Sequence, residues 1–323
     1  SPFNFVPDAR QGTAPLMNSE YGAVSAGGGD RDISWGFRYL TTQLRRHEKI
    51  QGYVYTELTD IEFEHNGFVN YDRSPKEFGY DTFVEGMTVA DLQGDDFVGF
   101  DAPPAILAEP GTELRIPAFV SHFSDREGEI MLRRWLIGVD DLGREIRVNL
   151  DSKPVRWERY RVTEQPPLEV TLPDRPFAGA MAMELADEQG RRIAANFVNV
   201  VTRRGVSKSS RGQRSPRLER LDARRVAIRL TPREVAAARW TGSGVMRRPG
   251  RAAVEKLTIR GAGWVEYRFP VPQPVIEANP TRLGLFLELA TRARDERLDW
   301  PQLLNPLDQP QTDGKKLPGT VNI

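Results

Sequence analysis

Cysteine is absent from the 323-residue sequence, which excludes disulfide bonds, thiolate metal sites and a thiol nucleophile. This fits a reducing compartment such as the cytoplasm, but secreted bacterial enzymes can also lack cysteine, so the location stays open. An excess of charge of one sign is also missing, because 45 Lys and Arg residues balance 45 Asp and Glu residues. A net charge of zero gives no overall attraction to nucleic acid or to a membrane surface, and we expect neither as a partner.

Long apolar runs are missing as well. No stretch reaches the roughly 20 apolar residues that span a bilayer. Residues 1–5 (SPFNF) have neither the basic nor the apolar region of a signal peptide. Hydrophobic residues nevertheless make up 39% of the chain, as in an ordinary folded protein. At roughly 100–200 residues for each domain, the length predicts two or three domains.

Residues 1–88 combine strand and helix signals. A short apolar run at 15–18 predicts a strand that ends near Glu20, and a glycine-rich loop follows. A second strand is expected over residues 53–59, after an intervening helix. The order strand, helix, strand predicts a β–α–β unit with parallel strands.

The intervening helix is expected to begin near Asp30 and Asp32, whose side chains are suitable N-caps. Its last turn is basic and ends near Arg46, as favoured by the helix dipole. The apolar face is expected to hold Phe37, Leu40 and Leu44.

Residues 89–202 change to period two, the pattern of half-buried strands. The alternating positions are Leu114, Ile116, Ala118 and Val120; Met131, Trp135, Ile137 and Val139; and Met181, Met183 and Leu185. Turn signals at 140–143 (DDLG) and 187–190 (DEQG) separate these runs. The pattern predicts an immunoglobulin-like antiparallel β-sandwich, with Trp135 and Trp157 in its core or at its rim.

Residues 203–217 are basic and contain no acidic residue, so we interpret them as a solvated linker. A nucleic-acid-binding arm is less well supported, because the segment has no aromatic residue on which a base could stack. Residues 218–323 return to alternation, as at Leu283, Leu285, Leu287 and Leu289, and predict a jelly-roll domain of galactose-binding type, incomplete at its C-terminus. Its candidate sugar platform consists of Trp240, Trp264 and Trp300, with core packing as the alternative for Trp264.

Glu20 is the candidate catalytic residue. It stands at a strand end before a glycine-rich loop, a setting that holds a carboxylate rigidly and leaves it accessible. A retaining glycosidase uses such a carboxylate as its nucleophile, with an acid/base carboxyl about 5–5.5 Å away. A hydrogen bond from Tyr21 would lower the pKa of Glu20. From these residues alone, a surface glutamate that opens a loop is the simpler interpretation.

Three segments resemble family 2 of the glycoside hydrolases. Residues 19–22 (SEYG) resemble the nucleophile segment on the seventh strand of that family's (β/α)8 barrel, and residues 52–60 (GYVYTELTD) resemble its eighth strand. Residues 70–76 (NYDRSPK) resemble the exit from the barrel. The resemblance implies that residues 1–88 are the last βα units of an incomplete barrel, and that Glu20 is the nucleophile.

The resemblance also implies a sugar site. Its candidate substrate-binding residues are Tyr21, Tyr55, Glu57 and Asn66. Tyr55 stands where the family usually has tryptophan, so the identity of the sugar stays open. The implied activity is hydrolysis of a terminal β-linked sugar through a covalent glycosyl-enzyme, with β-galactosidase as the first candidate. This chemistry requires no cofactor, and a homo-oligomer is compatible with it.

The acid/base carboxyl of the family has no counterpart in the chain. Glu57, Glu62 and Glu64 are weak candidates for it, since they lie on the next strand or its loop. We therefore expect the remainder of the barrel as a partner, and no activity from this chain alone. The alternatives are a non-catalytic carbohydrate-binding or structural β-sandwich protein with a barrel remnant, and a polysaccharide lyase or transglycosidase.

Two further groups have simple interpretations. Asp60, Glu62 and Glu64 alternate along the chain and could bind a hard cation, but solvated loop charges are the simpler expectation. His65 and His122 are isolated, which predicts surface or hydrogen-bonded histidines rather than metal ligands.

Overall fold

The computed structural model describes residues 8–10, 12–23, 33–61, 64–140, 143–202, 217–220, 224–229, 245–249, 255–259, 266, 269 and 271–285. Two compact units are present: residues 1–203 with 288–323, and residues 204–287. Within the described ranges, no helix is both long and apolar enough to cross a bilayer.

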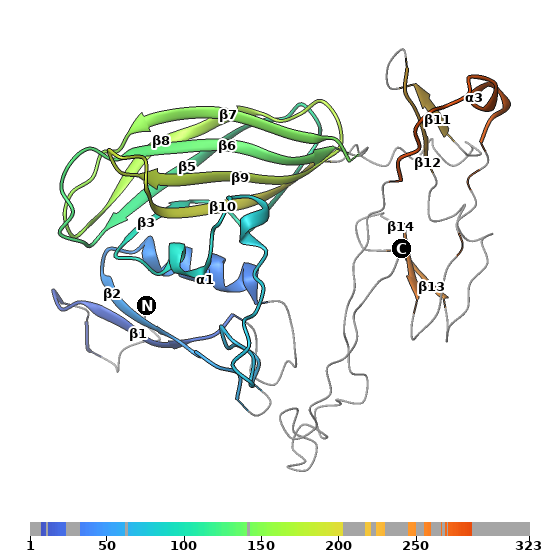
Figure 1. The fold of residues 1–323 in the computed structure, drawn as a ribbon. Helices are drawn as coiled ribbons and strands as arrows, with labels where there is room; N and C mark the ends of the chain where they lie inside the picture. The colour runs from blue at the N-terminus through green and yellow to red at the C-terminus, as the bar shows by residue number, and fades with distance from the viewer. Residues whose placement is uncertain are drawn as a thin grey trace, which may run out of the picture. The chain divides into compact units, whose positions relative to one another are not determined.

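The first unit begins with a β–α–β segment, as the sequence predicts. Strands β1 (Leu16–Tyr21) and β2 (Ile50–Tyr55) pair in parallel, and helix α1 (Ser34–Arg45) joins them. Figure 1 shows α1 between this two-stranded sheet and the large β-structure. The expected barrel is not evident, because β1 and β2 form a sheet of two strands and no closed barrel is present in the described part of the chain.

Helix α1 differs from the prediction in its start and in its buried face. It begins at Ser34 with Ile33 as N-cap and no side-chain cap, and the predicted caps Asp30 and Asp32 lie outside the described residues. The fully buried residues are Gly36, Phe37, Arg38, Thr41 and Thr42, whereas Leu40 and Leu44 are half-buried. The helix therefore buries polar groups as well as Phe37, because the surface against which it packs offers polar partners.

Residues 89–202 contain the predicted β-sandwich. The larger sheet has the order β4 (Ala105–Ala108), β10 (Arg192–Thr202), β9 (Phe177–Ala186), β6 (Met131–Asp140) and β7 (Glu145–Pro154). The smaller sheet has the order β3 (Asp96–Phe100), β5 (Glu113–His122) and β8 (Arg161–Thr171). All neighbouring strands are antiparallel except β4 and β10, which are parallel.

The predicted turns close two hairpins of the larger sheet. In the turn between β6 and β7, Gly143 has a φ of 69° and its N–H donates a hydrogen bond to the carbonyl of Asp140. Gly190 has a φ of 76° and its N–H bonds the carbonyl of Asp187 between β9 and β10. Glycine adopts this left-handed conformation without the steric cost that a side chain brings.

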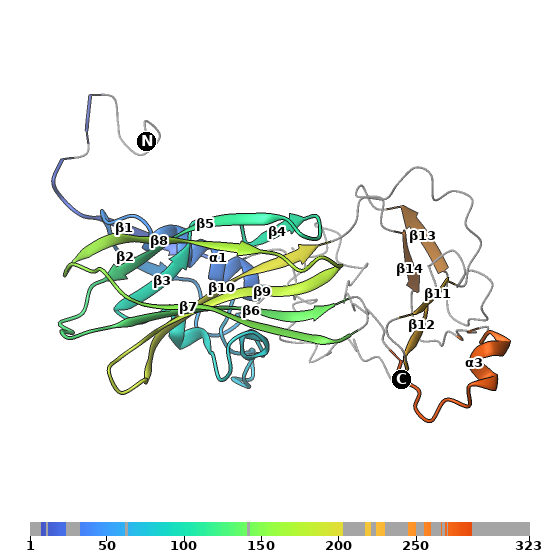
Figure 2. The same ribbon diagram turned by 90° about the horizontal axis from the view of Figure 1, so that it is seen from above.

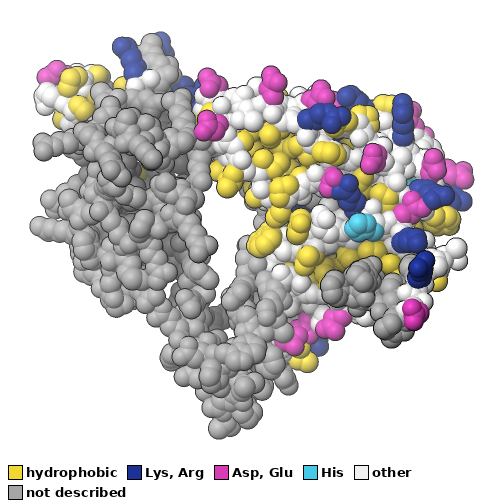
Figure 3. Space-filling model, turned by 180° about the vertical axis from the view of Figure 1, so that it is seen from behind, with side chains coloured by type: hydrophobic (Ala, Val, Ile, Leu, Met, Phe, Trp, Pro, Cys, Tyr) yellow, Lys and Arg dark blue, Asp and Glu magenta, His cyan; other side chains and the backbone are white. Residues whose placement is uncertain are grey.

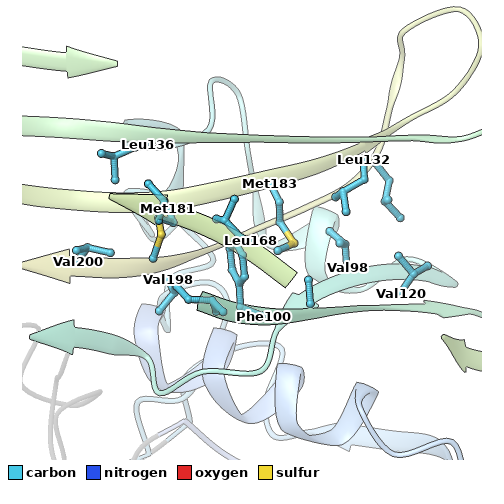
Figure 4. Close-up of a cluster of buried hydrophobic side chains, with 14 of the residues drawn as sticks. Val98, Phe100, Val120, Leu132, Leu136, Leu168, Met181, Met183, Val198 and Val200 are labelled. Atoms are coloured by element: carbon cyan, nitrogen blue, oxygen red, sulfur yellow. The ribbon is translucent and has the colours of Figure 1, made fainter. Parts of the chain in front are cut away.

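Apolar side chains from both sheets fill the space between them (Figure 4). Met181, Met183 and Leu185 of β9 belong to this core, as their alternation predicts, and so do Ile116, Ala118 and Val120 of β5. Burial of each large apolar side chain contributes about 1.5–3 kcal/mol. The core is therefore the main source of stability for the sandwich.

The larger sheet is also buried on its outer face, which the alternation pattern did not reveal. Trp135 and Ile137 of β6 lie on that face, and the core residues of the same strand are Leu132 and Leu136. The cover consists of Phe37 from α1 and the segment 78–92, including the 3-10 helices η2 (Tyr80–Thr82) and η3 (Val89–Leu92). Trp135 therefore packs outside the sandwich core, whereas Trp157 packs against that core from its edge.

The second unit contains two short antiparallel ladders and one helix in its described part. Strand β11 (Arg217–Arg220) pairs with β12 (Val226–Arg229), and β13 (Val245–Pro249) pairs with β14 (Glu255–Ile259), as Figure 2 shows. Helix α3 (Gln273–Glu277) follows. Residues 283–285 are not in a strand, contrary to the alternation of Leu283 and Leu285. Almost all of the linker, and Trp240, Trp264 and Trp300, lie outside the described residues.

Candidate active site

The candidate site lies where β1 and β2 end. The carboxyl ends of the two parallel strands meet at one edge, and the N–H of Thr56 bonds the carbonyl of Tyr21 at 2.9 Å. Glu20 is the penultimate residue of β1 and is exposed. Carboxyl ends of parallel strands are where barrel enzymes carry their catalytic groups. The structure therefore presents the carboxylate of Glu20 at the edge that such chemistry uses.

The side chain of Tyr21 contacts helix α1, whereas Glu20 is exposed. The hydroxyl groups of Tyr21 and Thr41 of α1 share a hydrogen bond of 2.7 Å, so Tyr21 points to the helix. Successive side chains of a regular strand point to opposite faces, but the pairing register of β1 is irregular between Asn18 and Tyr21, so alternation does not assign a face to Glu20. Ser19 and Glu20, the two residues at this irregularity, are both exposed.

The hydrogen bond with Thr41 also replaces the one expected between Tyr21 and Glu20. Burial raises the pKa of Tyr21 to about 12, and the hydrogen bond with Thr41 opposes that rise. A phenol with this pKa stays protonated at neutral pH. Tyr21 therefore joins β1 to α1, and the N–H of Glu20 donates a hydrogen bond of 3.2 Å to Oδ1 of Asn18.

Tyr55 lies in an aromatic cluster beneath the strand end. Its ring stacks on Phe68 at a centroid distance of 4.5 Å, and the edge of Phe37 approaches it at 5.0 Å. The hydroxyl donates a hydrogen bond of 2.7 Å to the carbonyl oxygen of Asn66, and burial raises the pKa of Tyr55. One face of the ring is thus covered by Phe68, so Tyr55 supports the loop that contains Asn66.

Asn66 joins the loops that follow the two strands. It is buried, and its side chain lies against Gly22, where a Cβ would be 2.8 Å from Nδ2 of Asn66. Only glycine permits so close an approach without displacement. The structure thus brings Glu20, Tyr21, Tyr55 and Asn66 to one edge of the sheet, with Glu20 exposed and Asn66 buried.

Asp60 anchors the loop after β2 through an internal ion pair. Oδ1 of Asp60 accepts bonds from Nζ of Lys76 at 2.7 Å and from the N–H of Gly67 at 2.8 Å, and Nδ1 of His65 lies 3.6 Å from Oδ2. Burial alone would raise the pKa of Asp60, but the bonds from His65 and Lys76 outweigh burial and lower it. Asp60 is therefore neither a solvated loop charge nor a free cation ligand.

No group of three or more His, Asp and Glu side chains suited to a metal ion occurs among the residues that the structure describes, and Glu62 lies outside those residues. His122 is buried and hydrogen-bonded, as predicted: its Nδ1 lies 2.7 Å from Oδ1 of Asp96, and its ring stacks on Trp157.

Glu57 is the second carboxyl at this edge. Burial raises its pKa, and the neighbouring charges of Glu64 and Asp60 raise it further. Its Oε1 atom is buried and has no hydrogen-bond partner in the described structure. A carboxyl of this kind retains a proton more readily and can bond a ligand hydroxyl.

Two residues that support the candidate site were not predicted from the sequence. Thr41 and Phe68 hold Tyr21 and Tyr55, respectively. The spacing of Thr41 four residues after Phe37 places both on one helix face, a usable signal. The contact of Phe68 depends on loop conformation, for which the sequence has no periodic signal. Glu20 does not line the cavity on β6 and β7.

No family model matches the sequence, and no curated protein matches it. Solved structures that match part of the chain include a family 123 glycoside hydrolase from Clostridium perfringens, with 9% identity, a TM-score of 0.26, and coverage of 33% of this chain and 27% of that chain. A β-glucosidase from Listeria innocua has 13% identity, a TM-score of 0.24, and coverage of 33% and 16%. Fibronectin(III)-like modules of Clostridium thermocellum CbhA have 17% identity, a TM-score of 0.20, and coverage of 33% and 96%.

The structural neighbours thus include glycoside hydrolases, and this chain spans 27% and 16% of the two that are described. At these scores the likeness carries no inference about activity or family.

Proposed function

We propose that β1, α1 and β2 are the last part of a (β/α)8 barrel in a retaining β-glycosidase of family 2 type, with Glu20 as the nucleophile. The observation that carries this proposal is the exposed carboxylate of Glu20 at the carboxyl end of a parallel strand. In a barrel, that end of the strands carries the active site. A β-galactosidase is the first candidate among the activities of the family.

In this mechanism, an oxygen of Glu20 attacks the anomeric carbon and the bond to the leaving oxygen breaks. An acid/base carboxyl, expected from outside these 323 residues, gives its proton to that oxygen and then takes one from water. The water cleaves the glycosyl ester and restores Glu20. Glu57 and Asn66 are the proposed partners of the sugar hydroxyls, and Tyr21 and Tyr55 hold the strand ends in position.

The proposed partner, the remainder of the barrel, is supported by the surface of the small sheet. In the described structure, β1 and β2 pair only with each other, and each keeps one open edge. Leu16, Met17 and Val54 on these strands are 38%, 65% and 43% exposed. Open edges and exposed apolar side chains favour further strand pairing.

The test uses the complete polypeptide that carries this chain. A 2-fluoro β-galactoside with a good leaving group should trap the glycosyl ester, and peptide mapping by mass spectrometry should locate the added mass on Glu20. Glu20→Gln should lower kcat for an aryl β-galactoside by at least about 10³-fold, because it removes the nucleophile. Glu109→Gln, at an exposed glutamate of the sandwich, is the matched control and should keep full activity.

Label on another residue, or full turnover by the Glu20→Gln variant, would remove Glu20 from the mechanism. A complete polypeptide that binds sugars but hydrolyses no β-glycoside would favour the non-catalytic carbohydrate-binding alternative. The 323-residue chain alone should show no turnover, and measurable turnover would mean that it contains its own acid/base.

A further inference from the structure

The larger sheet of the sandwich carries a cavity of about 560 Å³. It lies on strands β6 and β7, with Val84 and Glu85 on one side. This volume falls within the roughly 300–1,000 Å³ of small-molecule sites. None of the residues assigned above to the glycosidase site lines it.

Part of the cavity wall is neutralised and stiffened by internal ion pairs. Nε of Arg134 donates a hydrogen bond of 2.7 Å to Asp151, and the side chain of Arg134 is buried. Arg133 and Arg192 lie 3.2 and 3.4 Å from the carboxylate of Glu184. These charges are held within the protein, so their side chains form a fixed polar frame.

Two charged side chains of the wall, Arg147 and Glu85, take no part in these ion pairs. Arg147 of β7 is exposed, and the contact that the structure gives for its guanidinium is the ring of Trp135, 5.8 Å away. The carboxylate of Glu85 is also exposed, and among the described residues neither group forms an ion pair or a side-chain hydrogen bond. Asn149 and Ser152 add an amide and a hydroxyl to the same wall.

This set of groups matches the hydroxyls of a sugar. A guanidinium only donates hydrogen bonds, a carboxylate only accepts them, and an amide does both. A hydroxyl also does both, so adjacent hydroxyls of one ring can satisfy the whole set. An apolar ligand would bury these groups without partners, at a large cost, and a simple anion would leave Glu85 opposed by like charge.

We propose that this cavity binds a neutral saccharide of one or two rings, as a site separate from Glu20. Arg147 and Glu85 bond adjacent hydroxyls, Asn149 orients the ring, and Trp135 closes the floor. The site adds carbohydrate binding to the sandwich itself, and it does not depend on the proposed hydrolysis.

The test is calorimetric titration of the 323-residue chain with lactose and with cellobiose. At least one disaccharide should bind, and Arg147→Met should weaken that binding by about tenfold or more, because a hydrogen bond to a charged group is lost. Arg115→Gln is the matched control: Arg115 is an exposed arginine of the smaller sheet, and its variant should bind normally. Glu20→Gln should also bind normally, which separates this site from the proposed nucleophile.

Circular dichroism should show that the Arg147→Met variant is folded, and Asn149→Ala, on the exposed edge strand, provides a second variant with the same expected loss. Absence of binding by both disaccharides would overturn the proposal. Binding that neither variant weakens would also overturn it, as would equal competition by sodium sulfate, which would identify an anion site.

Discussion

At the scale of single residues, the candidate edge is held by one buried carboxylate. Asp60 is 6% exposed and bonds Lys76 and Gly67 from the loop after β2. That loop also carries Asn66, which lies against the loop after β1. Asp60 therefore fixes the surroundings of Glu20 without touching it.

Asp60→Asn should destabilise the chain by about 2 kcal/mol at pH 7, because the ammonium of Lys76 loses its buried partner. The pKa of Asp60 is lowered below its ordinary 3.8 in the folded protein. The unfolded chain therefore binds more protons in this range, and the contribution of Asp60 is present above about pH 4 and lost as the pH falls through the lowered pKa. Thermal unfolding at pH 7 and from pH 4 to 3 should show the difference between the two proteins shrinking.

Asp81→Asn is the matched control, since Asp81 is exposed in η2. It should leave the unfolding temperature nearly unchanged at each pH. A difference between Asp60→Asn and the parent chain that stays constant down to pH 3 would contradict the assigned ion pair.

The sequence predicted where the candidate residues lie along the strands better than it predicted where their side chains point. The two parallel strands are present, but the second covers residues 50–55 and not the predicted 53–59. The side chain of Tyr21, however, turns to Thr41, which lies 20 positions away, so no local pattern could indicate it. Local sequence sets strand position, whereas side-chain partners depend on tertiary packing.

At the scale of elements, α1 connects the small sheet to the sandwich through Arg38. The guanidinium is 3% exposed, donates to the carbonyl of Phe197 and, at 2.8 Å, to Oδ1 of Asn199, and lies over the Phe197 ring. Burial lowers its pKa to about 10. These acceptors are on β10, so the face of α1 that packs against the sandwich contains Arg38. Apolar periodicity does not predict a charged residue on that face.

Arg38→Met should destabilise the chain by about 2 kcal/mol, because the carbonyl of Phe197 and the amide of Asn199 lose their donor in a buried setting. Urea denaturation followed by tryptophan fluorescence measures this loss. Gln43→Met, at a half-buried position of the same helix, is the control and should change stability by less than about 0.5 kcal/mol. Equal stability of the two variants would show that the methionine packs as well as the guanidinium.

Period-two alternation predicted the sandwich because its core residues repeat every second position, as Met181, Met183 and Leu185 do. The same rule failed for the opposite face of the sheet. There Ala180, Ala182 and Phe197 are buried as well. A sheet covered on both sides has no polar face, so alternation alone cannot identify its cover.

At the scale of the whole molecule, the first unit mixes charges of both signs on its surface. Figure 3 shows Lys and Arg side chains among Asp and Glu side chains on one face, with hydrophobic side chains between them. The cover of the larger sheet is made by Phe37 of α1 and by residues 78–92, all of which precede the strands of the sandwich in the chain.

A chain shortened to residues 89–202 should therefore expose Trp135 and Phe197, because Tyr80, Val84 and Met87 of the cover are removed. It should bind more of the dye ANS and unfold at a lower temperature than a chain of residues 78–202. Equal dye binding and equal unfolding temperatures would show that the cover contributes nothing to the sandwich.

The contact of Arg38 with β10 has a consequence for how this protein can evolve. A substitution of Asn199, in the sandwich, would shift α1 and with it the strand that carries Glu20. Natural variants should therefore change positions 38 and 199 as a correlated pair, even though they are 161 residues apart in the chain.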